Sequence, residues 1–333
     1  MATVLASNST FDGMRPVNLR TDLAGIADLI EVCFGATMDE SGRAGVREMR
    51  MVSQSDSLSL LYNGMDRLMG GLDLGFVWVE KGIVIGNVSL SPANYPRSMG
   101  IGYLIANVAV HPNHRHHGIA QALMLAALDL IRQRHGTFAI LQVDASNEIA
   151  QHLYNRLAFR QERTFTRWIR SAHLRPATRL PEMPFMTLSE AREWPVELKL
   201  AELVRPNSAG GLGWLRPTHP DNFRGSIWQT FVDWMTARGE EHWIVRGEDG
   251  TSIQAVLRVR MSFGGSDKLE LLVHPSQQGK LEEPLLNAVL RRLEGRHRSV
   301  IMEHPADDPY ATRVLEYYGF EPRFTLIHMR KEL

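Results

Sequence analysis

The feature that most constrains the fold is an order of secondary-structure elements that occurs twice. Residues 76–170 show the periodicity of a β-hairpin, a strand, a helix, a strand, a helix and a strand. Residues 241–330 show the same order again. A period of ~160 residues is too long for a solenoid repeat, and each copy is long enough to bury its own core. The sequence therefore predicts two tandem domains of mixed α/β (α+β) class.

Prolines without hydrophobic periodicity mark the boundary between the two copies. Residues 173–184 carry three prolines and are the expected linker. They separate an expected N-terminal domain, residues 14–172, from an expected C-terminal domain, residues 185–333. Residues 1–13 are expected to be a flexible tail. Within each domain we expect a mostly antiparallel central sheet flanked by helices.

The composition excludes several classes of partner. Lysine plus arginine equals aspartate plus glutamate at 37 each, so no overall charge attracts nucleic acid or an anionic membrane. The single cysteine, Cys33, can form no internal disulfide, which fits a reducing compartment. No apolar run approaches the ~18 to 20 residues that span a bilayer, and the first residues do not resemble a secretory signal. We expect a cytoplasmic protein that binds neither nucleic acid nor membrane, and a homodimer is compatible with these features.

The stretch VAVHPNHRHHGIAQALMLAALDL, residues 108–130, passes from an apolar strand through a basic turn into an amphipathic helix. The first N–H groups of a helix lack intrahelical partners and lie at the positive end of its dipole. Gly118 allows a ligand to approach the backbone, Ala120 hinders it little, and Arg115 adds a positive charge. The turn therefore predicts an anion site of pyrophosphate size. A solvated turn remains an alternative, while a metal site is disfavoured because adjacent histidines diverge and no acidic or thiol partner is suitably spaced.

Two motifs in this half resemble those of a known family. RHHGIA, residues 115–120, follows a Val-x-Val-His-Pro strand and resembles the R/Q-x-x-G-x-G/A signature of the GCN5-related N-acetyltransferase (GNAT) family. ASNEIAQHLYNRLAF, residues 145–159, resembles the second signature of that family, an asparagine followed by a helix that ends in Leu-Tyr-x-x-x-Gly-Phe. Because both occur in order and in the right element context, the chain is identified as a tandem member with two acyl-CoA N-acyltransferase (GNAT) folds.

The resemblance implies acetyl-CoA as co-substrate and direct attack of a deprotonated amine on the thioester. By resemblance, the backbones of Val108 and Val110 would hold the pantetheine arm, and Val108 would also polarise the thioester oxygen. Tyr154 stands at the position of the usual general acid, and Asn147 at a position that contacts the CoA arm. The pyrophosphate would be held by the backbone amides of Arg115, His116, His117, Gly118, Ile119 and Ala120. Structural alternatives stay open: Tyr154 as a core residue, Asn147 as an N-cap and Arg115 as a solvated side chain.

The second copy has lost both signatures. When Gly279 is set against His116, Leu281 falls at the Gly118 position and Glu283 at the Ala120 position. Side chains there would block the approach to the backbone, and Glu282 and Glu283 would repel a phosphate. The same alignment puts Gln278 at the Arg115 position. Counting back from Gly319 as from Ala158 puts Leu315 at the Tyr154 position and Asp308 at the Asn147 position. We expect a degenerate second domain that does not bind acyl-CoA and that shapes the acceptor cleft or packs against the first.

The resulting functional hypothesis is an N-acetyltransferase that transfers an acetyl or other acyl group from acyl-CoA to a primary amine. The acceptor is a small molecule or a peptide, and no metal is expected. The alternative is a non-catalytic CoA-binding sensor or interaction module. Residues 101–110 contain no aspartate or glutamate, so the general base is not identified, although Asn107 could orient a water. The acceptor amine and the acyl chain length stay open as well.

Overall fold

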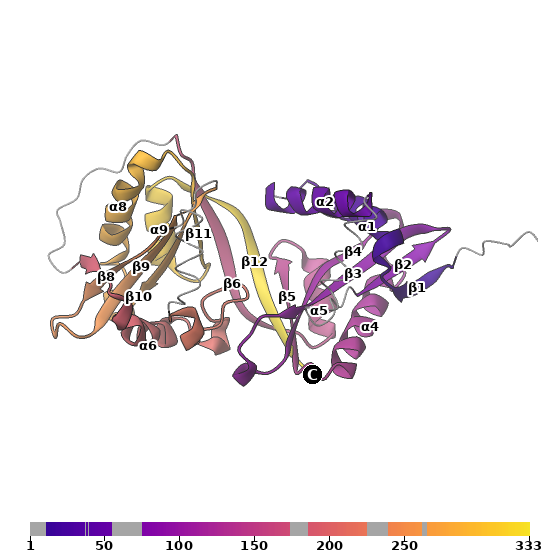
Figure 1. Cartoon of the computed structure of the whole chain (residues 1–333), viewed down its shortest axis with the longest axis horizontal. Coiled ribbons are helices and arrows are strands. Elements are labelled where there is room, and N and C mark those ends of the chain that lie inside the picture. Colours follow the sequence, from indigo (N-terminus) through magenta and orange to yellow (C-terminus); the bar gives the residue numbers. More distant parts are fainter. Residues whose placement is uncertain are drawn as a thin grey trace, which may run out of the picture. The chain divides into compact units, whose positions relative to one another are not determined.

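The computed structural model describes residues 11–36, 38, 40–54, 75–173, 186–224, 239–261 and 265–333. Residues 1–10 of the expected tail and 174–184 of the expected linker lie outside these ranges. The chain forms two compact units, one of residues 1–141 with 330–333 and the other of residues 142–329 (Figure 1). Each unit has a sheet with helices on both faces, so the predicted mixed α/β class with helix-flanked sheets is confirmed.

The first unit is built on five neighbouring strands. In spatial order these are β1 (Gly13–Pro16), β2 (Phe76–Glu80), β3 (Ile83–Ala93), β4 (Gly102–Val110) and β5 (Phe138–Asp144), of which residues 142–144 already belong to the second unit. All neighbours are antiparallel except β4 and β5, which are parallel. The β2–β3 hairpin turns at Lys81 and Gly82, whose φ angles of 50° and 77° are those of a tight hairpin turn.

Helices cover both faces of this sheet. Figure 1 shows α1 (Leu19–Phe34) and α2 (Glu40–Ser53) on one face and α4 (Ile119–Gln133) on the other. Ile26 and Ile30 of α1 pack on Val77 and Val79 of β2, as the predicted apolar stripe of this helix requires. On the α4 side, a Cβ added at Gly86 would come within 2.9 Å of the Ile119 side chain, so this glycine lets α4 lie close to β3.

The second unit repeats this arrangement with its own strands and helices. Its strands run in the spatial order β12 (Phe320–Glu332, of which residues 330–332 belong to the first unit), β6 (Arg160–Arg170), β11 (Val300–Pro305), β10 (Asp267–Val273), β9 (Ile253–Met261), β8 (Gly239–Arg246) and β7 (Met186–Leu188). Its helices are α5 (Glu148–Arg156), α6 (Trp194–Val204), α8 (Glu282–Leu293) and α9 (Pro309–Tyr317). In Figure 1, α8 and α9 lie on one face of the β8–β11 strands and α6 on the other.

The compact units do not follow the two sequence copies. β6, the last strand of the first copy, pairs antiparallel with β11 of the second copy, from Arg170 opposite Val300 to Phe165 opposite Pro305. This pairing satisfies the backbone of β11 along that edge, so residues 142–173 pack with the second unit. The two tandem domains predicted from the sequence are thus the copies of a proposed duplication. The compact units are the parts of the chain that pack together, and their boundary differs from that of the copies.

One strained residue offers a stability test. Ala158, after α5, has φ 62°, and Gly319 occupies the matching place after α9 with φ 76°. A Cβ in this left-handed region costs ~1–2 kcal/mol, partly offset by the greater unfolded-state entropy of glycine. Ala158→Gly is therefore expected to raise the free energy of unfolding by ~0.5–1 kcal/mol in urea denaturation. Ala145→Gly, at a position without positive φ, is the control and should not stabilise.

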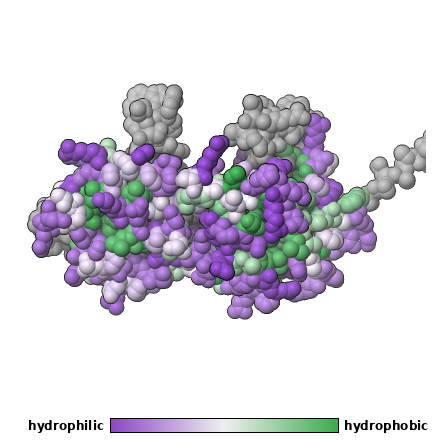
Figure 2. Space-filling model, turned by 90° about the horizontal axis from the view of Figure 1, so that it is seen from below, coloured by the Kyte–Doolittle hydropathy of each residue, from purple (hydrophilic) through white to green (hydrophobic). Residues whose placement is uncertain are grey.

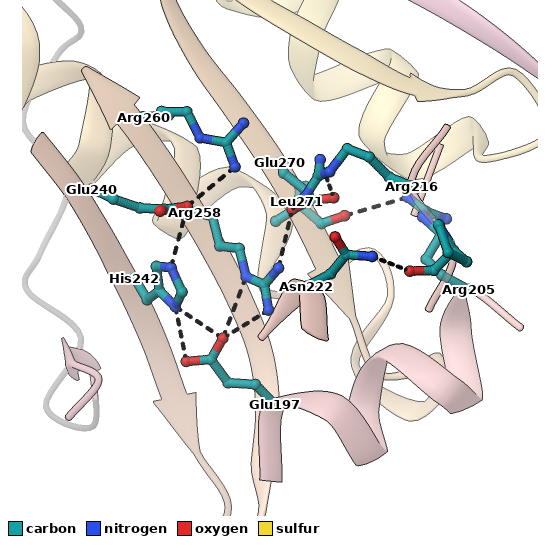
Figure 3. A network of polar contacts seen from close by, with 11 residues as sticks. Glu197, Arg205, Arg216, Asn222, Glu240, His242, Arg258, Arg260, Glu270 and Leu271 are labelled. Atoms are coloured by element: carbon teal, nitrogen blue, oxygen red, sulfur yellow. Dashed lines mark hydrogen bonds and ion pairs between the residues drawn. The ribbon is translucent and has the colours of Figure 1, made fainter. Parts of the chain in front are cut away.

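A buried network of charged side chains ties α6 to three strands of the second unit (Figure 3). Glu197 of α6, 2% exposed, accepts a hydrogen bond from Arg258 Nη2 at 3.0 Å and lies 3.0 Å from Nδ1 of His242. Arg258 also donates to Glu270 at 3.3 Å, and Glu270 accepts two bonds from Arg216 at 3.0 and 3.1 Å. Buried charges persist only when they are paired and hydrogen-bonded in this way.

This network predicts a pH dependence of stability. Burial alone would lower the pKa of His242, but the carboxylates of Glu197 and Glu240 outweigh it and raise the pKa to about 9. The folded state therefore binds the proton more tightly, so this contribution is complete below pH ~6.5 and is lost as the pH rises through about 9. The free energy of unfolding should fall over this range with a slope of at most ~1.4 kcal/mol per pH unit for one proton.

Urea denaturation of the full chain at pH 6, 7.5 and 9 measures that slope. His242→Gln should flatten it, because the group that releases the proton is gone. His219→Gln, which changes a histidine outside the network, should keep it. An unchanged slope in His242→Gln would assign the pH dependence to other groups.

The surface shows no large apolar region on the face seen in Figure 2, where hydrophobic residues form separate patches among hydrophilic ones. Within the described residues, no helix combines the length and the apolar character needed to cross a membrane.

Candidate acyl-CoA site

A β-bulge interrupts β4 at the point where the sequence predicts the acyl group. Asn107 and Val108 together stand opposite Val88 of β3, and Asn107 has φ 50°. The fully buried Asn87 holds the bulge, because its Nδ2 donates to the Asn107 carbonyl at 2.9 Å. Sequence reasoning missed Asn87, although an asparagine inside the apolar run of β3 was a visible signal.

Beyond the bulge, one edge of β4 pairs with no other strand among the described residues. The pairing of β4 with β5 covers only Gly102–Leu104 against Phe138–Ile140. The His111 N–H donates to the Ile85 carbonyl on the β3 side, so Val110 and Val108 present their N–H and C=O groups to the opposite side. An extended polar chain could therefore pair with β4 there as an additional strand.

The Val110 carbonyl on this edge already has two contacts within the first unit. It accepts a hydrogen bond from Arg115 Nε at 3.2 Å and lies 3.4 Å from Cys33 Sγ. Arg115 thus braces the end of the strand against the turn that follows. No such contact is found for the Val108 backbone on this edge in the described part of the chain.

The turn between β4 and α4 carries a run of unused backbone donors. His116 has φ 66° and Gly118 φ 77°, so the chain doubles back before the helix begins. In the described part of the chain no protein acceptor is found for the N–H groups of His116, His117, Gly118, Ile119 and Ala120. The Arg115 N–H differs, since it donates to the Pro112 carbonyl at 3.4 Å. A Cβ added at Gly118 would meet nothing within 4 Å, so the space in front of these amides is open.

The histidines of this turn make local contacts. His111 Nδ1 accepts from the Asn113 N–H at 3.3 Å, and His114 Nδ1 lies 3.1 Å from Oε2 of Glu80. His117 Nδ1 lies 3.3 Å from the His114 carbonyl. In the described ranges, no group of three or more histidine, cysteine or acidic side chains is arranged to hold a metal ion.

Tyr154 lies on α5 and Asn147 directly precedes this helix, both in the second unit. The Asn147 side chain caps this helix, because its Oδ1 accepts from the Ala150 N–H at 3.1 Å. Tyr154 is 6% exposed and packs edge-to-face on Phe159 at 6.0 Å between ring centroids. Burial raises the pKa of Tyr154 to about 12, so its hydroxyl remains a proton donor throughout the physiological range.

The corresponding turn of the second copy is closed. Gly279 has φ 79°, in agreement with its alignment to His116, but Leu281 has φ −103° where Gly118 has φ 77°. The N–H groups of Lys280 and Leu281 donate to the Gln277 carbonyl at 3.1 and 3.4 Å, and a Cβ at Gly279 would lie 2.9 Å from the Tyr310 ring. The open row of amides found in the first unit is therefore absent from this described turn.

A cavity of about 300 Å³ adjoins the bulge in the first unit. Asn107 contributes a polar group, and the remaining walls come from α1, α2 and the segment between them. The apolar side chains that line it are Ile30, Phe34, Met38, Val46 and Met49. No charged side chain lines it within the described residues, so this cavity suits an apolar group.

The comparisons with known proteins agree with this geometry. Residues 49–159 match the Acetyltransferase (GNAT) family model, whereas no curated protein sequence matches the chain. The chain is similar in structure to a GCN5-related N-acetyltransferase from Sphaerobacter thermophilus, with a TM-score of 0.61 and 16% identity over 96% of this chain and 95% of that chain. It is also similar to a tandem GNAT protein from the clavulanic acid biosynthesis pathway, with a TM-score of 0.52 and 15% identity over 96% and 98% of the two chains. The two structural likenesses show the fold, and the family-model match confirms the predicted resemblance to the GNAT family for residues 49–159.

Proposed function

We propose that this chain, which contains a domain of the acetyltransferase (GNAT) family at residues 49–159, is an acyl-CoA-dependent N-acyltransferase with its cofactor-binding site in the first unit. The observation that carries the proposal is the combination of two features of the described residues: an edge of β4 that pairs with no strand beyond Leu104, and a row of amides without a protein acceptor at the next turn. The first suits the amide-rich arm of acetyl-CoA, and the second suits its pyrophosphate. Both lie on one continuous segment, from Val108 to Ala120.

In the proposed reaction, a neutral amine attacks the thioester carbonyl carbon of acetyl-CoA. The C–N bond forms, the C–S bond breaks, and CoA leaves as its thiolate. The Val108 N–H would stabilise the negative charge on the carbonyl oxygen in the transition state. The proton lost from the amine goes to water, because no acidic side chain lies on β4.

From the position of Tyr154 in the second family signature, we further propose that its hydroxyl donates a hydrogen bond to the departing sulfur. A phenol with a pKa of about 12 is a weaker acid than a thiol of pKa ~8.5, so complete proton transfer to the thiolate is uphill. Stabilisation of the thiolate by the hydroxyl is the favoured role. The apolar cavity beside Asn107 is the proposed entrance for the acceptor, which favours an amine carried on an aliphatic or aromatic body.

The direct experiment incubates the full chain with acetyl-CoA and a panel of small-molecule and peptide amines, and measures release of free thiol. Time-dependent thiol release that requires both substrates supports an acyltransferase. Binding of CoA without turnover on any amine would instead favour the non-catalytic sensor.

Tyr154→Phe tests the assigned donor. We expect kcat to fall at least tenfold, because one charge-assisted hydrogen bond to the leaving group is lost, while the Kd for acetyl-CoA changes less than twofold. Calorimetry and thiol release measure the two quantities. Tyr310→Phe, which alters an exposed hydroxyl of the second unit, is the control and should leave both unchanged. Loss of acetyl-CoA binding in Tyr154→Phe would contradict the assigned role.

A further inference from the structure

A second cavity, of about 210 Å³, lies wholly within the second unit. It is found where β10 and β11 end, and Gln278 and Asp308, the counterparts of Arg115 and Asn147, are among its lining residues. It therefore corresponds by position to the candidate acyl-CoA site of the first copy. Its volume is below the ~300–1,000 Å³ of sites for drug-sized ligands, which restricts it to small molecules.

A buried cation lines this cavity without a direct counter-ion. Arg205 is 7% exposed, and its Nη2 donates to the Leu271 carbonyl at 3.3 Å and lies 3.4 Å from His304 Nδ1. Figure 3 shows Arg205 at the end of the charged network away from His242. Within the described residues, no carboxylate oxygen lies within 4.0 Å of the guanidinium, and no hydrogen bond from Nε or Nη1 is found.

The imidazole beside Arg205 is neutral and does not replace that counter-ion. His304 is 2% exposed, and its Nε2 lies 2.9 Å from Asp308 Oδ2. Burial and the neighbouring Arg205 lower its pKa, so Nε2 carries the hydrogen that it donates to Asp308, and Nδ1 accepts from Arg205. A neutral ring thus separates Arg205 from the nearest aspartate. Because a buried charge without a hydrogen-bonded counter-ion is costly, the site favours a ligand that supplies a carboxylate.

Two aspartates determine whether a simple anion or a zwitterion fits this cavity. Asp307, with a 64% exposed side chain, pairs with Arg163 at 3.0 Å, and Asp308 accepts from the N–H groups of Tyr310 and Ala311. The cavity therefore holds two arginines and two aspartates among its lining residues, with no net charge. A simple anion would leave it negative and would face both aspartates, whereas a zwitterion matches both signs.

We propose that this cavity binds an aliphatic α-amino acid. The carboxylate lies on Arg205, the ammonium group faces Asp307 and Asp308, and the side chain packs on the apolar walls formed by Leu203, Val204, Leu271 and Val273. This site is separate from the proposed acyl transfer and stands or falls independently of it.

Calorimetry on the full chain tests the proposal with L-valine and two matched fragments. The fragment 3-methylbutanoate lacks the ammonium group, and 2-methylpropylamine lacks the carboxylate. We expect L-valine to bind and both fragments to bind at least tenfold more weakly, since each loses one charge-assisted interaction. Equal affinity for 3-methylbutanoate, tighter binding of inorganic phosphate, or no binding of L-valine would each overturn the proposal.

Substitutions locate the site. Arg205→Met should weaken L-valine binding at least tenfold while leaving the Kd for CoA unchanged, which separates this site from the one in the first unit. Arg192→Met, at a side chain that is 82% exposed, is the matched control and should bind like the original protein. Asp307→Asn, at an exposed position on the rim of the cavity, keeps the test valid if Arg205→Met does not fold. Asp307→Asn should weaken the binding of L-valine but not that of 3-methylbutanoate. Unchanged L-valine affinity in Arg205→Met, or in Asp307→Asn where Arg205→Met does not fold, would contradict the assignment.

Discussion

Gly118→Asp is expected to weaken CoA binding at least ~100-fold, at a cost of at most ~1–2 kcal/mol in stability. Gly118 is the N-cap of α4 and has φ 77°, and aspartate is both a favourable N-cap residue and one of the few side chains that tolerate this conformation. No described protein atom lies within 4 Å of the position of the added Cβ, so the side chain meets no steric clash and the stability cost is that of the positive φ alone. Its carboxylate would accept from the amides proposed to hold the pyrophosphate and would repel that group.

The size of this effect follows from the charge. Two like charges ~4 Å apart interact by ~4 kcal/mol at an effective dielectric constant of ~20, and a factor of 100 needs ~2.7 kcal/mol. Gly118→Asn is the matched control, because it has nearly the same size and conformational tolerance without the charge. It should lose about tenfold from bulk alone.

Calorimetry measures the Kd for CoA, and thermal unfolding measures the stability of each variant. The two substitutions together separate charge from steric hindrance. If Gly118→Asp bound CoA as tightly as Gly118→Asn, the ligand's anionic group would not lie at this turn. The cofactor would then bind elsewhere, and the proposed function would lose the observation that carries it.

The turn itself could be predicted because its signals are local. A strand, a glycine and an amphipathic helix in succession are enough to predict exposed helix amides, and five of the six predicted amide positions indeed have no acceptor in the described structure. Arg115 differs because its N–H closes a turn onto Pro112, a contact that depends on the conformation of the His-Pro segment.

Features that depend on long-range pairing could not be predicted. The pairing of β6 with β11 joins strands more than 100 residues apart, and hydrophobic periodicity does not specify which partner a strand chooses. The bulge at Asn107 depends on Asn87, 20 residues earlier, and the cavity at Arg205 needs β10, β11 and α6 together. For the same reason the cavity beside Asn107, which α1 and α2 complete, could not be predicted.

Arg258→Met is expected to lower the free energy of unfolding by ~3–5 kcal/mol. Arg258 has a side chain that is 4% exposed and contacts both Glu197 and Glu270, whose side chains are 3% and 14% exposed. Its guanidinium also lies 4.2 Å from the centre of the Phe223 ring. Methionine retains an apolar stem but leaves two buried carboxylates short of a partner, and removal of one partner from a buried ion pair typically costs this much.

Arg260→Met supplies the control from the same strand. Arg260 pairs with Glu240 at 3.3 Å, but its side chain is 47% exposed, and a pair of this kind contributes at most ~1 kcal/mol. Urea denaturation of both variants at pH 7 measures the difference. Comparable losses in the two would mean that burial does not set the strength of this network. A large loss in Arg258→Met alone would show that the charges of Glu197 and Glu270 require a cation between α6 and β10, and therefore that this part of the second unit is held by electrostatics as well as by its apolar core.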